Sequence, residues 1–184
     1  MADNVLIDAI RDSFARTTYT HKTYEKQLEI QYRDLNLYRW CRFIVIAITA
    51  TGAISNIFTN ANFLKITTVI FAVLSLFLTL YGLGKKPEEN VSELQRTARD
   101  LWFVREKYLH LIADLTAGSI DDAAAIQQRD HLTDMLNEIH HDAPQTTAQA
   151  YKKAQKALKL NEEMTFSDEE IDSFLPASLK KATK

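Results

Sequence analysis

The residues best suited to bind a metal ion or to sense pH are two adjacent histidines and an aspartate, His140, His141 and Asp142. Imidazole and carboxylate groups are common ligands of transition metals, and histidine titrates near neutral pH. Adjacent residues on a helix, however, point about 100° apart, and no further cysteine or carboxylate set completes a site. We therefore expect no metal here and predict solvated residues at a helix end.

No group of residues has the pattern of a catalytic centre. The sequence offers no glycine-rich phosphate loop, no nucleophile with a plausible base and no paired carboxylates at a suitable spacing. The single cysteine, Cys41, excludes an internal disulfide and is interpreted as a small apolar filler. We expect neither an enzyme nor a cofactor. A net charge of −2 supplies no basic field, so we expect no direct nucleic-acid binding.

Four lysines crowd one expected helix, at about 146–163: Lys152, Lys153, Lys156 and Lys159. Such a face is suited to anionic lipid, a nucleotide or an acidic partner. The simpler interpretation, which we favour, is a solvated face whose charge is balanced by Glu162, Glu163 and the acidic residues that follow.

Small and hydroxyl-bearing side chains form a stripe along each of two apolar segments. Spacings of three and four place them on one face of each expected helix. The stripe, called here the hydroxyl stripe, consists of Thr68, Ala72, Ser75, Thr79 and Gly82 in the second segment and Ala47, Thr51 and Ser55 in the first. Hydroxyl groups tolerate water and would suit a pore lining, whereas small residues equally suit close helix packing. With no intramembrane charge, such a pore would be weakly selective.

The two apolar segments, residues 40–58 and 63–83, are joined by a short loop at 59–62. As helices they would span roughly 28–31 Å, close to the thickness of a bilayer's hydrocarbon core. Apolar side chains cover all sides of both, unlike the single stripe of a surface helix. A chain of 184 residues is too small to wrap two such helices in a soluble core. We predict a transmembrane helical hairpin, with the lipid bilayer as a partner.

Basic residues flank the hairpin on one side: Arg33, Arg39 and Arg42 before it, and Lys85 and Lys86 after it. The positive-inside rule then places both termini in the cytoplasm. We accordingly divide the chain into a cytoplasmic N-terminal helical region (1–39), the hairpin (40–84) and a cytoplasmic C-terminal helical region (85–184).

Residues at alternating spacings of three and four predict a coiled-coil seam on each side of the hairpin. The spacing runs through Gln31 and Ala98, and the stalk seam consists of the other positions, Tyr24, Leu28, Leu35 and Tyr38 before the hairpin and Leu94, Leu101, Arg105, Tyr108 and Ile112 after it. Because the hairpin brings its two ends together, we predict that these helices pair antiparallel. Arg105 interrupts the seam, and we expect it to set the register or to pair with an acidic residue such as Asp34.

Local signals predict where the remaining helices begin and end, so the whole chain is expected to be all-α. Asn90 or Ser92 is suited to cap the helix that follows Pro87. Shorter helices are expected at about 121–140 and 146–163. A small helix should then start at Ser167, with Glu170 completing a capping box, and stop at Pro176.

A polar helix, a tight membrane hairpin, a long amphipathic helix and the C-terminal stretch EEMTFSDEEIDSFLP (162–176) together resemble the SLATT family. The name stands for the SMODS- and SLOG-associating two-transmembrane effector domain. The resemblance covers about residues 17–179. It implies a bacterial conflict-system effector in the inner membrane, encoded beside a sensor such as a nucleotide-second-messenger synthase or a reverse transcriptase. The family brings no catalytic residues.

Three functions remain open at this point. The leading one is an anti-phage effector that forms a homo-oligomer, opens a pore and permeabilises the inner membrane in abortive infection. The pore requires several copies, because one two-helix hairpin cannot enclose water. The alternative is a membrane anchor or scaffold that recruits a sensor or an enzyme through its cytoplasmic helices. The third is a soluble or lipid-carrying helical bundle.

Overall fold

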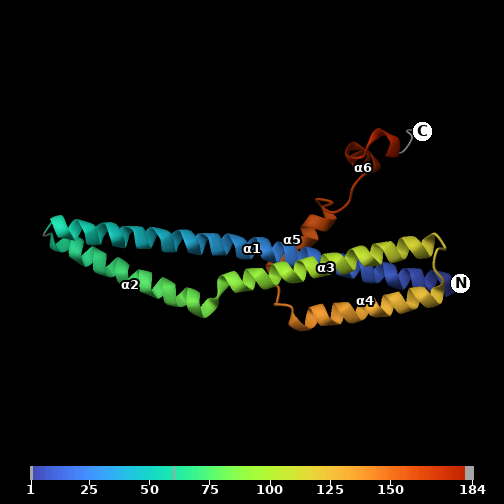
Figure 1. Ribbon diagram of the computed structural model, residues 1–184, viewed down its shortest axis with the longest axis horizontal. Helices are drawn as coiled ribbons and strands as arrows, with labels where there is room; N and C mark the ends of the chain where they lie inside the picture. Colours follow the sequence, from blue (N-terminus) through green and yellow to red (C-terminus); the bar gives the residue numbers. More distant parts are fainter. Residues whose placement is uncertain (1, 60, 181–184) are drawn as a thin grey trace.

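The computed structural model describes residues 2–59 and 61–180, and this part of the chain is helical without strands. The elements are α1 (Ala2–Phe58), α2 (Asn62–Lys85), α3 (Pro87–Thr116), α4 (Asp122–Asp142), α5 (Ala148–Lys159), α6 (Asp168–Phe174) and a 3₁₀ turn, η1 (Ala177–Leu179). Figure 1 shows an elongated molecule with a two-helix hairpin at one end and a bundle at the other. The predicted all-α fold, with a hairpin and an antiparallel helical stalk, is confirmed.

Helix α1 connects the two ends of the molecule as a single rod. It contains 57 residues and is therefore about 86 Å long. Its first part packs against α3, α4 and α5 in the bundle, and its last part packs against α2 in the hairpin. The helix continues without interruption through Trp40, where the first apolar segment begins. One continuous helix thus connects the bundle to the hairpin on this side.

The return path, by contrast, bends between α2 and α3 (Figure 1). Lys86 adopts the left-handed conformation, with φ of 43°, and its N–H donates to the Gly82 carbonyl at 3.0 Å. Pro87 starts α3, a position where its missing N–H costs no helical hydrogen bond. The expectation that Asn90 or Ser92 caps this helix is wrong, because the helix has already begun at Pro87.

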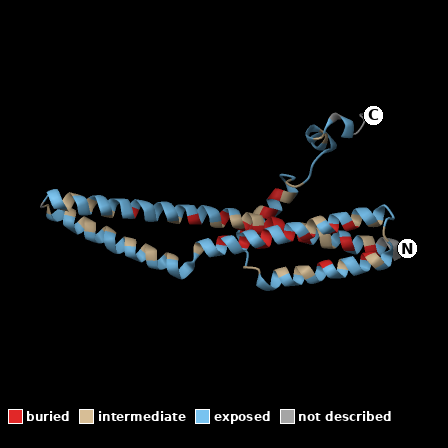
Figure 2. Cartoon of the chain, viewed as in Figure 1, coloured by how far each residue is buried: buried red, intermediate tan, exposed pale blue. Residues whose placement is uncertain are grey.

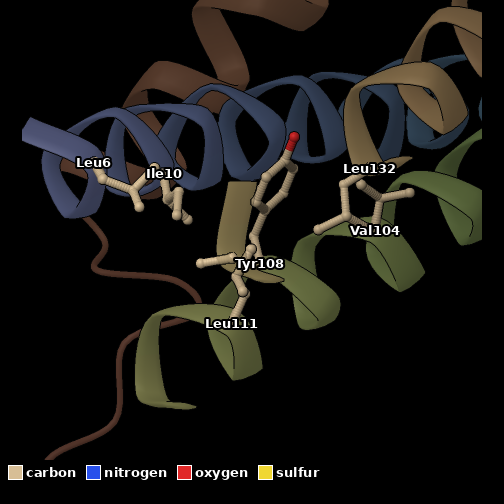
Figure 3. Close-up of a cluster of buried hydrophobic side chains, with 7 residues drawn as sticks. Leu6, Ile10, Val104, Tyr108, Leu111 and Leu132 are labelled. Atoms are coloured by element: carbon tan, nitrogen blue, oxygen red, sulfur yellow. The ribbon is translucent and has the colours of Figure 1, made fainter. Parts of the chain in front are cut away.

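The bundle core lies between the first half of α1 and α3, and α4 and α5 add buried residues to it (Figure 2). Figure 3 shows its main apolar cluster, which consists of Leu6, Ile10, Val104, Tyr108, Leu111, Ala125 and Leu132. A second cluster, nearer the hairpin, joins Tyr24 to Leu94, Ala98 and Leu101. Of the stalk seam, Tyr24, Leu35, Leu94, Leu101 and Tyr108 are buried, and Leu28, Tyr38, Arg105 and Ile112 are partly buried.

Arg105 does not reach Asp34. Its guanidinium lies over the rings of Phe14 and Trp102, 5.3 and 4.7 Å from their centroids, and it pairs with the neighbouring Glu106. Phe14 and Asp34 are about 30 Å apart along α1, so an arginine beside one cannot reach the other. Asp34 instead pairs with Arg33.

The short helices start at the expected kinds of residue. Asp121 caps α4, and Thr147 caps α5. Ser167 and Glu170 form the predicted capping box of α6. Helix α5 ends at Lys159, four residues before the expected Glu163, because Glu162 is left-handed, with φ of 51°, and the chain turns back there.

Candidate functional site

The outer surface of the hairpin is apolar and uncovered. Helix α2 has no buried residue, and side chains such as Phe43, Val73 and Phe77 are 63–64% exposed. Cys41 is exposed as well. Core helices of soluble proteins are mostly buried, whereas here 6% of the most apolar window of α1 and none of that of α2 is buried. An apolar surface of this extent requires an apolar environment, and both helices are long enough to cross a bilayer.

At the end nearest the connecting loop, the seam between α1 and α2 has an open cavity of about 360 Å³. Four residues of the hydroxyl stripe line it: Ala47, Thr51 and Ser55 from α1 and Thr68 from α2. Gly52 makes this contact possible, since a Cβ added there would lie 2.4 Å from Thr68 Oγ1. Asn56 Nδ2 donates to the same oxygen at 3.3 Å. Gly52 and Asn56 were missed from the sequence, although their small and polar character inside an apolar segment was a usable signal.

At the end nearest the bend at Lys86, the seam has a second open cavity, of about 310 Å³, between Tyr38, Arg42, Thr79 and Gly82. Tyr38 Oη donates to the Leu78 carbonyl at 2.8 Å and so links α1 to α2. A Cβ at Gly82 would lie 2.1 Å from Tyr38 Oη. A side chain at this position would therefore displace the Tyr38 ring from its place between the two helices.

The remaining residues of the hydroxyl stripe, Ala72 and Ser75, lie in the middle of α2 and line neither cavity. Ser75 and Thr79 are half-buried, and Ala72 is exposed. The hydroxyl groups of Thr51 and Thr79 donate to the carbonyls of Ala47 and Ser75, each at 2.9 Å. Donation within the helix satisfies the hydroxyl proton in an apolar environment, while the oxygen can still accept a hydrogen bond. Within one chain, the contacts of Thr68 and Gly82 are those of helix packing.

The segment that follows α4 is attached to α1 largely by polar contacts. Gln27, only 2% exposed, accepts hydrogen bonds from Thr147 N and Thr147 Oγ1 at 2.9 and 2.8 Å. Tyr24 Oη donates to the Pro144 carbonyl at 2.9 Å. Helix α5 packs on α1 and turns a buried alanine face inward, made of Ala150, Ala154 and Ala157. Small side chains allow this close approach, and the polar contacts fix its register.

A group of ion pairs holds the chain beyond α5. Lys22 Nζ lies 2.8 Å from Glu163 Oε2 and 2.7 Å from Glu25 Oε2, and Lys26 Nζ lies 3.3 Å from Glu163 Oε2. Burial disfavours the charge of Lys22, but the hydrogen bonds to Glu163 and Glu25 outweigh it and raise the pKa of the ammonium. The hydrogen bonds of Lys22 and then Lys26 lower the pKa of Glu163.

Glu25 also meets His21. His21 Nε2 lies 3.5 Å from Glu25 Oε1, and His21 Nδ1 lies 2.9 Å from the Ala98 carbonyl of α3. Interaction with His21 and then with Lys22 lowers the pKa of Glu25 to about 2. The arrangement therefore links α1, α3 and the C-terminal segment through charged and polar groups.

Comparison with known proteins adds a match along most of the chain. The model of the SMODS and SLOG-associating 2TM effector domain family 4 matches residues 6–170. The chain belongs to this family. No curated protein and no solved structure gives a match. The expected SLATT resemblance is confirmed. The family is an effector class with two transmembrane helices that is associated with SMODS and SLOG partners in conflict systems, and it is not a known enzyme family.

In this SLATT chain the four lysines of α5 do not meet the acidic residues expected to balance them. Within residues 2–59 and 61–180 none of the four forms an ion pair, and Glu163 binds α1 instead. The interpretation that Glu163 balances the lysines is therefore wrong. The register of α5 turns the alanines toward α1, which leaves Lys152, Lys156 and Lys159 exposed and Lys153 partly buried.

The histidine pair lies at the end of α4 in this SLATT chain. His141 and Asp142 are 86% and 88% exposed in their side chains, with Nδ1 of the histidine 2.9 Å from Oδ1 of the aspartate. In the part of the chain that the structure describes, no three potential metal ligands lie together. The geometry at this helix end is that of exposed, solvated side chains.

Proposed function

We propose that this chain is the membrane effector of a bacterial anti-phage conflict system, which oligomerises into a pore and permeabilises the inner membrane when a partner sensor is triggered. The bundle and both termini lie in the cytoplasm in this proposal. The observation that carries it is the hairpin itself. Its apolar surface is uncovered, yet hydroxyl-bearing residues of both helices line cavities along one seam.

Several copies are needed for such a pore. Two helices cannot surround a water path, whereas a symmetric ring of hairpins can turn one helix edge toward its axis. Thr79 lines the cavity beside Tyr38, and Ser75, one turn before it, is likewise only partly buried. Their hydroxyl oxygens would accept hydrogen bonds from water in the open state at little cost to the closed one.

The two connections between bundle and hairpin suggest how a sensor would act. Helix α1 is continuous, so a rotation of its bundle half is carried directly into the membrane. On the other side the chain bends at Lys86, where α2 can change its tilt relative to α3. A partner such as a nucleotide-second-messenger synthase or a reverse transcriptase would bind the bundle and so change the rotation of α1 and the tilt of α2.

The test is membrane potential in bacteria that express the chain with its neighbouring sensor. Ser75→Leu with Thr79→Leu should keep the potential intact, because leucines exclude water from the stripe. Ser75→Ala with Thr79→Val should weaken the loss of potential without adding bulk. The matched control is Val73→Leu with Phe77→Leu, which alters the exposed face of α2 and should depolarise cells as the native chain does.

Membrane levels of all variants must be equal for the comparison. Equal depolarisation by the native chain and the leucine variant would overturn the pore lining. If unrelated apolar helices in place of 40–58 and 63–83 preserve cell killing, the hairpin is only an anchor, and the scaffold function replaces the pore.

A further inference from the structure

Helix α6 projects from the molecule with large apolar side chains uncovered. Phe166 is 65% exposed, Phe174 is 80% exposed and Ile171 is 44% exposed. The same seven-residue helix carries four carboxylates, Asp168, Glu169, Glu170 and Asp172. It is not packed extensively against any other helix of the described chain, and Figure 1 shows it standing beside the bundle. A short, capped, acidic and apolar helix in this position has the chemistry of a docking element.

The complementary surface is present on α5. Its outward side carries the basic face, Lys152, Lys153, Lys156 and Lys159, none of which has an ion pair within the described residues. Tyr151 and Leu160 flank this face and are 52% and 73% exposed. Four positive charges beside two exposed apolar side chains match the acidic side chains of α6 and the exposed apolar side chains of Phe166, Ile171 and Phe174.

The chain's own α6 is directed away from this surface. Glu163 is held on α1 by Lys22 and Lys26. Glu162 and Met164, on either side of it, are both left-handed, with φ of 51° and 74°. The backbone leaves this anchor away from α5 (Figure 1). The basic face and the acidic helix of one chain are thus separated by the contact that fixes the segment between them.

Anionic lipid is a poor match for the basic face because of distance. The residue before α5, Thr147, binds Gln27, and α5 leads from there toward Tyr19, whose ring lies 5.3 Å from that of Tyr151. Gln27 and Trp40 are thirteen positions apart on α1, which is about 20 Å. The field of a membrane surface is screened within about 8–10 Å at physiological salt.

A second copy in the same membrane meets the geometric requirement. The bilayer holds all copies upright and at one depth, so the basic faces of neighbours lie at the same height. Helix α6 extends sideways from the long axis of the molecule at the level of the bundle (Figure 1). We propose that α6 of one copy docks on the basic face of α5 of the neighbouring copy. This inference rests on the proposed oligomerisation, and the docking is the contact between copies outside the membrane.

Such a contact is head-to-tail, because each copy gives one surface and receives another. Head-to-tail contacts close into a ring when the rotation between neighbours divides a full turn, and otherwise continue as an open filament. The ion pairs at Glu163 set the direction of α6 and thereby the angle between neighbours. The cytoplasmic contact would thus fix the geometry of a ring whose hairpins meet in the membrane.

The test is zero-length carbodiimide cross-linking of the full chain in membranes, which joins a lysine to a carboxylate in direct contact. Mixing unlabelled and ¹⁵N-labelled chains separates links between copies from links within one copy. Mixed-isotope peptides that join α5 to α6 are expected. Links found only within single chains, or no α5–α6 link, would overturn the inference.

Complementation sharpens this test. One variant carries Lys152→Glu with Lys156→Glu, and the other carries Glu169→Lys with Asp172→Lys. Each alone should lose the link, because like charges then face each other. A mixture of the two should regain it, since native α6 of the first chain can meet native α5 of the second. Failure of the mixture to regain the link would overturn a contact between copies, even if one reversed helix is unfolded.

Two further measurements separate this inference from the proposed function. Arg11→Glu with Arg99→Glu reverses two exposed charges on α1 and α3 and should leave the α5–α6 link unchanged. The mass of the complexes in the same membranes is measured in parallel. Oligomers without the α5–α6 link would overturn the docking alone, whereas an absence of oligomers would overturn both the docking and the pore.

Discussion

Lys22 Nζ lies 2.8 Å from Glu163 Oε2, and this ion pair joins the first helix of the chain to the segment that leads into its last. The Lys22 side chain is only 9% exposed. A buried ammonium is costly unless it is paired. Here both Glu163 and Glu25 form ion pairs with the Lys22 ammonium. Because α1 continues into the hairpin, the position of α6 is tied to the rod that enters the membrane.

We expect Glu163→Gln to release the segment from Leu160 onward while the bundle stays folded. Lys22 keeps Glu25 and Lys26 keeps Glu29, so the cost should be about 1 kcal/mol. Hydrogen exchange measures it directly, since the Glu163 N–H donates to the Ala157 carbonyl at 3.0 Å and should lose protection. Glu162→Gln removes an adjacent exposed carboxylate and should change nothing; equal loss in both variants would contradict this role.

Acid should weaken the same group of ion pairs within a defined window. The pKa of Glu25 is lowered from 4.5 to about 2, first by His21 and then by Lys22. A carboxyl group whose pKa is lower in the folded state stabilises that state above its unfolded pKa, and this contribution is lost as the pH falls toward the folded pKa. We therefore expect the contribution of Glu25 to the free energy of unfolding to stay constant between pH 5 and 8. That contribution should be lost as the pH falls from about 4.5 to about 2.

The ring of Trp102 lies 5.3 Å from that of His21 and can report this titration. In a Trp40→Phe background, its fluorescence should change across the acid window, because protonation of Glu25 removes the partner of His21. Glu25→Gln should abolish that change. An unaltered titration in Glu25→Gln would assign it to another carboxyl group.

The features that the sequence predicted are those that depend on neighbouring residues. Length and apolarity define the hairpin, spacing defines the stalk seam, and the capping box of Ser167 and Glu170 spans only four positions. The partner of Arg105 was mispredicted because spacing places a side chain on a face but does not say which turn of the facing helix it meets. The partners of Gln27 and Tyr24 lie 120 residues away in sequence, and no local pattern indicates them.

Only part of the candidate site in the hairpin could be predicted from the sequence. The hydroxyl stripe was found from its spacing, but the residues that bring the two helices together there, Gly52 and Asn56, were not. Their role depends on where α2 crosses α1, which only the packed structure defines. The bend at Lys86 was also missed, since a left-handed lysine follows from the packing on both sides rather than from its own preference.

Gly82→Ala should separate α1 and α2 at the end of the hairpin nearest the bundle. Its Cβ would lie 2.1 Å from Tyr38 Oη, so the tyrosine must move and its hydrogen bond to the Leu78 carbonyl is lost. Tyr38→Phe removes that oxygen and should cost about 1 kcal/mol by itself. The double variant should be more stable than the sum of the two changes predicts, by roughly 1–2 kcal/mol.

Unfolding of the hairpin by a denaturing detergent measures this cycle. Gly84→Ala is the matched control, because nothing lies within 4 Å of a Cβ at that position. It should be neutral or slightly stabilising through the higher helix propensity of alanine. Additive effects of Gly82→Ala and Tyr38→Phe would show that the two residues do not contact each other in the membrane.

Substitutions at Tyr108 can show whether the end of the bundle away from the hairpin is stabilised by packing alone. The side chain is fully buried in the main apolar cluster (Figure 3), yet its hydroxyl oxygen has no hydrogen-bond partner among the described residues. Removal of an unpaired buried hydroxyl costs nothing or stabilises, so Tyr108→Phe should leave the free energy of unfolding unchanged or raise it by up to about 1 kcal/mol. Tyr108→Ala should lower it by about 3–5 kcal/mol, because a large cavity remains.

Thermal unfolding followed by circular dichroism distinguishes these outcomes for Tyr108. Leu109→Ala, at a neighbouring position that is 41% exposed, is the control and should cost less than about 1 kcal/mol. A clear loss of stability in Tyr108→Phe would mean that the hydroxyl has a partner beyond the described residues, such as a buried water. That partner would lie at the end of the bundle where α1 begins, beside Leu6 and Ile10.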